Sequence, residues 1–393
     1  MKHDAELPKT NLGNKIKNFN LLIAAAILLA GLAWVWTQGL PWLGKNHSHL
    51  LPLSEPLETP WRAFYAEQHI GAEESFEDWV RRTRQTHPGD WGFWLTHLQG
   101  LSPDVAYPLL KSLHVDSLLM DISKLWDSDL TEIKSAKTTL FEVLSRYRSL
   151  QKYTDSTLQS LHKQPNSDRI LSNKSKATKP LAIIGMVGLF QYQTALTDTS
   201  LWIGLDMFMN EEYRYYPSVE QLYEYQRRRT APRYMPVAVA RTLAEDWVSG
   251  NLKITSKSDI TLLDQIIREG QTLACMRWLL PEVHDTLLLG YSAAQWKWIK
   301  NNQGQVWRDL VSKDLLFTGD PAILSRYLND GPFSSGYPQQ SPPALGLFIG
   351  DAVVQNWIQG HRETEARPAW TLLLKNRNLT ANQILKKSGY KGR

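Results

Sequence analysis

Apolar residues form one long uninterrupted stretch near the amino terminus of the chain. Residues 21–36 contain no charged side chain, and with the next four residues the stretch runs from Leu21 to Leu40. A helix of ~20 residues is long enough to cross the ~30 Å hydrocarbon core of a bilayer. We therefore expect a single transmembrane anchor at residues 21–40.

The residues on either side of this stretch indicate its orientation. Lys15 and Lys17 precede it, and tryptophans gather at its far end, where indole rings favour the bilayer interface. The positive-inside rule then keeps residues 1–20 as a cytoplasmic tail and exports the remainder. A cleaved signal peptide is the alternative, but bulky tryptophans occupy the positions where a cleavage site needs small residues.

The exported part begins with a polar connection and continues with helical periodicity. Residues 41–60 contain four prolines in mostly polar surroundings, which is typical of a stalk. Residues 61–165 are expected to form a helical region, and residues 163–179 an exposed polar loop. The helical spacing i, i+3, i+4, i+7 is seen at Leu140, Val143, Leu144 and Tyr147, and a further helix is expected over residues 109–118.

The pattern changes to that of a small sheet and then returns to helices. Residues 181–187 and 201–208 are short, partly β-branched apolar runs that predict two neighbouring strands. The sum is an α+β protein, with a small sheet followed by long helices in one domain over residues 180–393. The helices expected after the strands are residues 237–249, 259–279, 292–314, 320–329, 343–360 and 380–387.

Charge is distributed unevenly along the 393 residues. The formal net charge is +5, yet the last twenty residues alone carry six basic side chains and no acidic one. The first twenty contribute a further +2, which leaves −3 for the body of the protein. The positive net charge comes from the two ends of the chain, whereas the body of the protein is negatively charged. The body is therefore not a basic nucleic-acid-binding domain, and no nucleic acid partner is expected.

The residue types that carry catalysis and metal binding are poorly represented. A zinc peptidase needs two histidines one helical turn apart, and no two of the ten histidines are four residues apart. The single cysteine, Cys275, excludes a thiolate metal site or a disulfide framework. No nucleophile elbow and no phosphate-binding glycine loop is present, and Gly346 and Gly350 are better explained by close helix packing. We expect no cofactor, no metal and no catalytic residue.

Two features remain as candidates for binding. Arginines and tyrosines are concentrated in residues 213–234, where an anion or glycan contact competes with a solvated loop whose arginines pair with nearby glutamates. Glu269 is a single carboxylate on an otherwise apolar helix face, and such a residue is more often an ion-pair partner than a catalyst. The candidate binding residues are Tyr213, Tyr216, Arg233, Tyr234 and Glu269.

An ordered series of short segments in residues 180–393 resembles the gliding motility-associated lipoprotein GldB family. No single segment is specific, but their order and spacing together are. They include 201–208 (LWIGLDMF), 233–236 (RYMP), 262–270 (LLDQIIREG), 329–333 (NDGPF), 341–343 (SPP) and 384–391 (ILKKSGYK). The chain departs from the family at its anchor, because Leu32 stands where the lipid-bearing cysteine of a lipoprotein would be.

The resemblance implies a fold related to the zincin peptidases. These enzymes place a strand pair before a helix with the H-E-x-x-H motif and carry a further glutamate ligand on a later helix. Here the first helix reads Val239-Ala240-Arg241-Thr242-Leu243-Ala244-Glu245, without either histidine, while Glu269 remains on the second. A peptidase-like domain without its metal is therefore implied.

The expected function is that of a non-catalytic accessory or scaffold protein. It would be anchored in the inner membrane, face the periplasm, and serve the envelope machinery of gliding motility and type IX secretion through protein partners. Residues 201–208 were expected to be an edge strand that accepts an extended partner segment, with the tyrosines and Arg233 at the mouth of the cleft. The alternatives are a membrane-anchored hydrolase acting on envelope peptides, and a structural protein without a cleft ligand.

Overall fold

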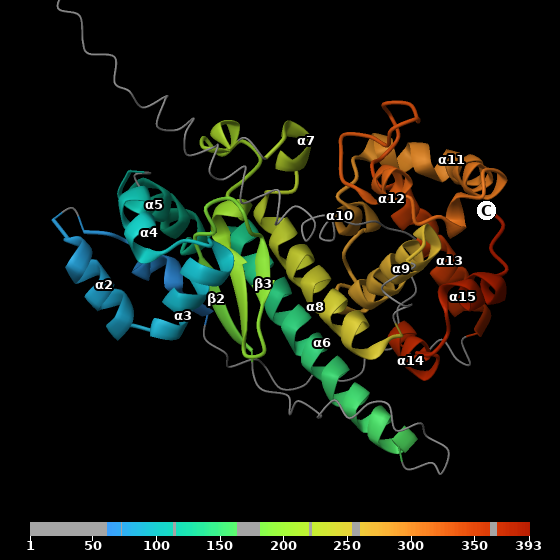
Figure 1. Ribbon diagram of the computed structural model, residues 1–393, viewed down its shortest axis with the longest axis horizontal. Helices are drawn as coiled ribbons and strands as arrows, with labels where there is room; N and C mark the ends of the chain where they lie inside the picture. Colours follow the sequence, from blue (N-terminus) through green and yellow to red (C-terminus); the bar gives the residue numbers. More distant parts are fainter. Residues whose placement is uncertain are drawn as a thin grey trace, which may run out of the picture.

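The computed structural model describes residues 61–71, 73–112, 115–162, 181–219, 222–253, 260–361 and 368–393. In these ranges helices dominate, and four short strands form one sheet (Figure 1). The helices before the sheet are α2 (Phe76–Gln85), α3 (Pro88–Gly92), α4 (Pro103–Ser112), α5 (Val115–Trp126) and α6 (Thr131–His162). Those after it are α7 (Glu224–Arg227), α8 (Met235–Asn251), α9 (Leu262–Leu279), α10 (Asp285–Leu289), α11 (Ala293–Ser312), α12 (Pro321–Leu328), α13 (Leu345–His361), α14 (Ala369–Lys375) and α15 (Ala381–Ser388).

The sheet has the strand order β1-β2-β4-β3. Strands β1, β2 and β4 are parallel, and β3 pairs antiparallel with β4. The strands are β1 (Trp61–Ala63), β2 (Ala182–Met186), β3 (Thr194–Leu196) and β4 (Ser200–Gly204). All five residues of β4 are buried, as expected for a parallel strand that is covered on both faces.

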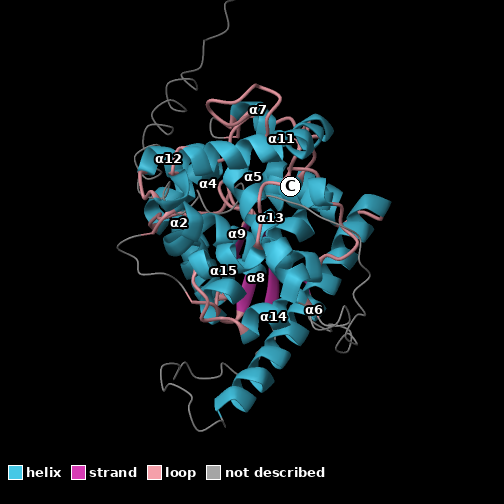
Figure 2. Ribbon diagram, turned by 90° about the vertical axis from the view of Figure 1, so that its right-hand side faces the viewer, coloured by secondary structure: helices cyan, strands magenta, loops and turns pink. Residues whose placement is uncertain are grey.

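The sheet lies between two groups of helices. The amino-terminal helices α2 to α5 lie on one side in Figure 1, while α6 and α8 cross the other side, and Figure 2 shows the strands behind α8. Trp202 of β4 packs its ring against Phe64 and Phe93, at centroid distances of 5.4 Å and 5.0 Å. Aromatic side chains from the first helical region thus fill the core beneath the sheet.

The carboxyl-terminal helices pack around a close contact between α9 and α13. A Cβ placed on Gly350 would lie 1.7 Å from the carbonyl oxygen of Ile266, and one on Gly270 would lie 2.4 Å from the carbonyl oxygen of Gly350. Only glycine allows backbones to approach this closely. The interpretation of Gly346 and Gly350 as helix-packing residues is confirmed.

The helical periodicity predicted most elements after the sheet to within a few residues. The expected helices 237–249, 292–314 and 343–360 are observed as α8, α11 and α13. Residues 181–187 and 201–208 do contain neighbouring strands, β2 and β4. The helix expected over residues 109–118 is wrong as a single element, because α4 ends at Ser112 and α5 begins at Val115.

Three expectations about the strands are wrong. Residues 61–63, expected to be helical, form β1, and residues 205–208 form a 3₁₀ turn instead of the end of a strand. The strand within 201–208 is not an edge either, since β4 is hydrogen-bonded to β2 on one side and to β3 on the other. The short β3, unpredicted because three residues give no periodicity, is therefore the strand that ends the sheet beyond β4.

The two expected regions share this sheet and its core. Strand β1 belongs to residues 61–165 and pairs with β2 of residues 180–393. Tyr147 of α6 donates a 2.7 Å hydrogen bond to Asp246 of α8. The tail, the anchor at residues 21–40, the stalk and the loop at 163–179 lie outside the described residues. In the part that is described, every helix is too short or too polar to traverse a bilayer.

Candidate functional site

A buried ionic triad connects α8 with α9. Arg241 of α8 is 5% exposed, and its guanidinium donates to Glu269 of α9 at 2.5 Å. The same guanidinium forms an ion pair with Glu245, one helical turn further along α8, at 2.8 Å. A full positive charge in the interior is tolerated because two carboxylates from two helices face it.

The environment shifts the acid–base behaviour of this triad. Burial lowers the pKa of Arg241, but Glu269 and Glu245 raise it by more, so the guanidinium stays charged. Burial raises the pKa of Glu245 from 4.5 to about 7, although Arg241 acts in the opposite direction. The triad is therefore a fixed cation between two carboxylates, one of which gains a proton near neutral pH.

A groove with a mixed apolar and polar lining lies beside the triad, between β3, α8 and the segment before α8. It consists of two adjoining hollows of about 80 Å³ and about 40 Å³. Four residues line both hollows, and we call their common surface the arginine groove: Gln193, Arg229, Ala238 and Arg241. Thr194 of β3 and Thr242 of α8 share a 2.6 Å hydroxyl hydrogen bond at its wall, which holds the strand against the helix.

Arg229 is the second cation of the groove. It is 8% exposed, and it forms an ion pair with the half-buried Asp330, which also accepts a hydrogen bond from Gln226. Within the described residues no acceptor meets Nε of Arg229. A guanidinium presents five N–H donors in a rigid fork, and this buried N–H is a donor that the described part of the protein leaves without an acceptor beside the groove.

The neighbouring Arg228 supports the same corner of the groove. Its guanidinium donates to the carbonyl oxygen of Gly290 at 2.5 Å. Burial lowers the pKa of Arg228, and the positive charge of Arg229 lowers it further. A Cβ on Gly290 would lie 2.5 Å from the side chain of Arg229, and Gly290 has φ +61°, so glycine is required where this loop passes the arginine.

Two of the tyrosines expected at a cleft mouth have structural roles instead. Tyr216 is fully buried; its hydroxyl donates to the carbonyl oxygen of Asp206 at 2.9 Å and accepts from the backbone N–H of Met209. Tyr213 is half-buried and donates to Asp121 of α5 at 2.9 Å. The expectation that Tyr216 reaches a binding surface is wrong, because its hydroxyl holds the turn after β4 in place.

The other predicted residues lie closer to the groove. Tyr234 is 9% exposed and lines the smaller hollow, whereas Arg233 is exposed and pairs with Glu211 at 2.9 Å. The guanidinium of Arg233 also lies over the ring of Tyr234, 5.5 Å from its centroid. Glu269 is buried and touches the groove only through Arg241, as the ion-pair interpretation predicted.

Sequence reasoning missed Arg229 and Arg241 as the central cations. Arg229 was noticed only as part of a basic run, and Arg241 only as a departure from a histidine motif. The spacing of Arg241 and Glu245 on an apolar helix was the available signal, because an oppositely charged pair at i, i+4 on a buried face implies mutual neutralisation. The position of Gln193 and Thr194 in the groove could not be predicted, because it depends on the pairing of β3 with β4.

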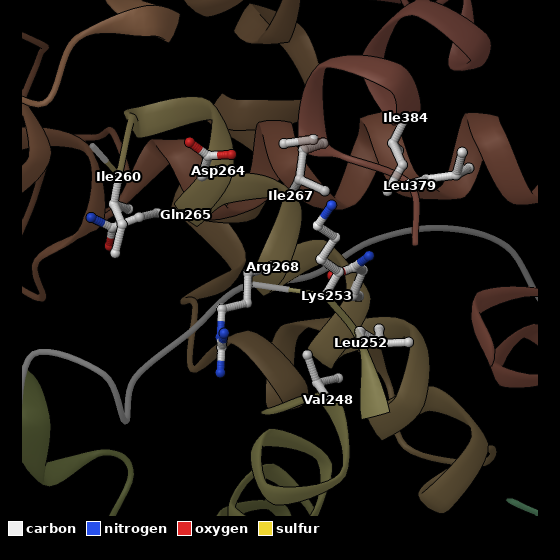
Figure 3. A pocket seen from close by; sticks show the side chains of 12 residues that line it. Val248, Leu252, Lys253, Ile260, Asp264, Gln265, Ile267, Arg268, Leu379 and Ile384 are labelled. Carbon is white, nitrogen blue, oxygen red and sulfur yellow. The ribbon is translucent and has the colours of Figure 1, made fainter. Parts of the chain in front are cut away.

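A second, separate hollow lies between the end of α8, α9 and α15. Its volume is about 50 Å³, and Figure 3 shows apolar side chains around it together with Lys253, Asp264, Gln265 and Arg268. Across the described ranges, no three His, Cys, Asp or Glu side chains come together in a way that could hold a metal ion.

Comparison with known proteins identifies one family. The sequence model for the family described as gliding motility protein GldB matches residues 104–392. The matched segment includes α4 to α15 and all the residues of the arginine groove. No curated protein and no solved structure gives a significant match to the chain.

Proposed function

The chain belongs to the gliding motility protein GldB family, and from this membership and the geometry of α8 and α9 we propose that it is a non-catalytic accessory protein of the motility machinery. In this proposal residues 21–40 anchor it in the inner membrane. The folded domain then faces the periplasm, among the envelope components of motility and type IX secretion. The arginine groove holds a segment of a partner protein.

The observation that carries the proposal is the position of Arg241. In a zincin-type peptidase, two histidines one turn apart on the first helix and a glutamate on a later helix hold the zinc ion. Here Arg241 and Glu245 are one turn apart on α8, and Glu269 approaches from α9. The guanidinium lies between the two carboxylates and pairs with both, which supports a peptidase-like domain that has exchanged catalysis for binding.

The groove next to this triad is suited to an extended polypeptide. Strand β3 ends the sheet at the groove, and Gln193 and Thr194 bring hydrogen-bonding side chains to the same wall. Arg229 adds a buried N–H without an acceptor among the described residues. A backbone carbonyl or a carboxylate of a bound segment would accept a hydrogen bond from the guanidinium of Arg229.

The test is to fill the groove without disturbing the fold. Ala238 is half-buried on α8 and lines both hollows, so an Ala238→Leu substitution places a larger side chain in the groove. Ala294, exposed on α11, provides the matched control Ala294→Leu. We expect Ala238→Leu to abolish colony spreading and crosslinked partner capture in cells, with the melting temperature changed little and the control behaving as wild type.

Normal spreading and normal capture with Ala238→Leu would exclude the groove as the binding site. If spreading and partner capture are lost together with a large fall in melting temperature, the variant has unfolded and a second measurement decides. For that case a photo-crosslinking residue at Gln193 gives an independent measurement, since only a segment bound in the groove should be captured there.

A membrane-anchored hydrolase is the second candidate, and one observation favours it. The pKa of Glu245, raised to about 7 by burial, is in the range of a general base at neutral pH. Elemental analysis of the purified chain after dialysis separates the two functions. We expect no stoichiometric zinc, because two carboxylates need nitrogen or sulfur partners to hold zinc tightly. One zinc per chain would favour the hydrolase.

A further inference from the structure

The carboxyl-terminal end of the chain is a folded, positively charged surface. Residues 374–393 contain six basic side chains and no acidic one. Helix α15 is amphipathic: Ala381 and Ile384 are buried, whereas Lys386 and Lys387 are exposed. The apolar face of α15 packs against α9 and α13, so the lysines are held pointing outward.

The last residues are fixed to the fold and continue this surface. Tyr390 is buried, and its ring packs edge-on against Trp307 of α11 at a centroid distance of 5.0 Å. Gly392 has φ +85° and lies so close to Trp307 that a Cβ would be 2.8 Å from the indole ring. Between and beyond these buried residues, Lys391 and Arg393 are exposed.

Among the described residues, no carboxylate pairs with the basic side chains of this surface. Lys386, Lys387, Lys391 and Arg393 form no ion pair with any carboxylate in the described part of the chain. Arg308 of α11 is exposed and lies near Gly304, which Gly392 contacts, so α11 adds a further positive charge beside the tail. We call this surface, made by Lys386, Lys387, Lys391, Arg393 and Arg308, the basic face.

A hollow lined by both apolar and polar side chains adjoins α15, at the same end of the molecule. Ile384 and Ala381 form part of its wall, and Ile267 and Leu252 lie opposite (Figure 3). Lys253 is exposed beside it, and its backbone N–H donates to the carbonyl oxygen of Arg377 at 2.9 Å, which ties it to the connection before α15. Lys253 and Arg268 on the wall of this hollow place two further basic side chains at this end of the molecule, beside Asp264 of the same wall.

We propose that the basic face binds the surface of a bilayer that contains anionic lipids. Each basic side chain near such a surface strengthens binding by about fivefold, and clusters of several are needed because a single charge is too weak. The charges are spread over a helix, a tail and a second helix, which suits a broad surface of phosphate head groups. This proposal rests on the proposed membrane location of the chain, where anionic lipid is within reach.

The experiment measures vesicle binding by the full chain held in phosphatidylcholine nanodiscs. The probes are vesicles rich in phosphatidylglycerol and vesicles of phosphatidylcholine alone, compared at low and high salt. The test variant combines Lys386→Gln, Lys387→Gln, Lys391→Gln and Arg393→Gln. The control variant removes four exposed charges elsewhere, by Arg84→Gln, Lys124→Gln, Lys152→Gln and Arg326→Gln, none of which forms an ion pair in the described residues.

Wild type and the control variant are expected to bind the phosphatidylglycerol vesicles and not the neutral ones, with binding weakened by salt. The test variant should bind at least about tenfold more weakly. Equal binding by the test variant would overturn the proposal, as would equal binding to neutral vesicles. Binding to soluble polyglutamate but not to vesicles would assign the face to an acidic protein instead.

Two further arms separate the remaining possibilities. Inorganic phosphate that displaces the vesicles far more effectively than chloride at equal ionic strength would indicate a discrete anion site and overturn binding to a lipid surface. A chain that does not enter nanodiscs would contradict the proposed anchor, not the basic face. In that case the same vesicles are presented to the chain in solution, so the two failures remain distinguishable.

Discussion

Arg241 is a cation that the protein interior accepts only because Glu245 and Glu269 surround it. Arg241 and Glu269 have lost nearly all contact with water, since their side chains are 6% and 8% exposed, whereas Glu245 is partly buried, with its side chain 26% exposed. Replacing the arginine therefore leaves two carboxylates facing each other without compensation. Breaking a buried pair in this way costs more than the pair itself contributes, because the desolvated charge remains.

We predict that Arg241→Met destabilises the protein by about 3–5 kcal/mol. Arg326→Met, at an exposed position on α12, is the control and should change stability by less than about 0.5 kcal/mol. Chemical denaturation of the two variants measures the difference. If Arg241→Met lowers the free energy of unfolding no more than Arg326→Met does, Arg241 does not hold the two carboxylates.

Glu245 gives the triad a dependence on pH with a defined sign. Its pKa is raised from 4.5 to about 7 in the folded protein, mainly by burial, so the folded state binds a proton that the unfolded state releases. The resulting stability is fully present below pH 4.5 and is lost as the pH rises toward 7. Asp206 and Asp351, whose pKa values burial raises to about 6, act in the same direction over a lower range.

The Glu245→Gln variant isolates this contribution, because glutamine does not titrate. We predict that the variant gains stability relative to wild type as the pH rises from about 5 to about 7.5, since only wild type must deprotonate a buried carboxyl group. Melting temperatures of both proteins across this range provide the measurement. Parallel curves would show that Glu245 keeps an ordinary pKa.

Individual side chains differed in how far sequence could predict their roles. Glu269 was correctly interpreted as an ion-pair partner, because a lone carboxylate on an apolar helix face needs a cation. Tyr216 was misjudged as exposed, because nothing in its local sequence indicates that the chain turns there and buries the ring. Arg229 could not be assigned, since its partner Asp330 is remote in sequence.

At the level of elements, the contact between α9 and α13 depends on glycine. Gly350 brings the backbone of α13 against Ile266 of α9, with no room for a methyl group. In the same helix, Gly360 has no neighbour within 4 Å of the position a Cβ would take. One helix thus contains both a glycine that packing requires and one that it does not.

We predict that Gly350→Ala destabilises the protein by more than about 3 kcal/mol, because a rigid carbonyl group must move. Gly360→Ala should be neutral or stabilising by up to about 1 kcal/mol, because alanine favours the helix. Thermal unfolding of the pair tests both at once. Similar melting temperatures for the two variants would contradict the observed approach of the helices.

Long helices could be predicted from the sequence, whereas short strands that pair with residues remote in the sequence could not. Helices α8, α11 and α13 repeat apolar positions over many residues, so local pattern is enough to find them. β1 and β3 contain three residues each, and their pairing partners lie outside their own segments. The order of the strands followed from that pairing, which is why β4 was mistaken for an edge and the groove was placed on the wrong strand.

At the level of the whole molecule, the amino-terminal helices and the basic face lie at different ends of the fold (Figure 1). The helices α2 to α5 and the carboxyl terminus lie on opposite sides of the sheet and α8 (Figure 1). The arginine groove lies between them, on α8 and β3. A domain that is tethered at its beginning and binds anionic lipid at its end would hold the groove at a fixed orientation to the membrane.

The last prediction concerns that tether. Lys15 and Lys17 before residues 21–40, with tryptophans after them, predict that the amino terminus stays in the cytoplasm and that the domain is exported. A reporter active only in the periplasm should therefore be active when fused at Arg393, and a cytoplasmic reporter at the same position should be inactive. Residues 21–40 should hold the chain in the membrane fraction at its full size, whereas a cleaved signal peptide would give a shorter, extractable protein. The reverse reporter pattern would place the groove and the basic face in the cytoplasm, and partners of the domain would then have to be sought on that side of the membrane.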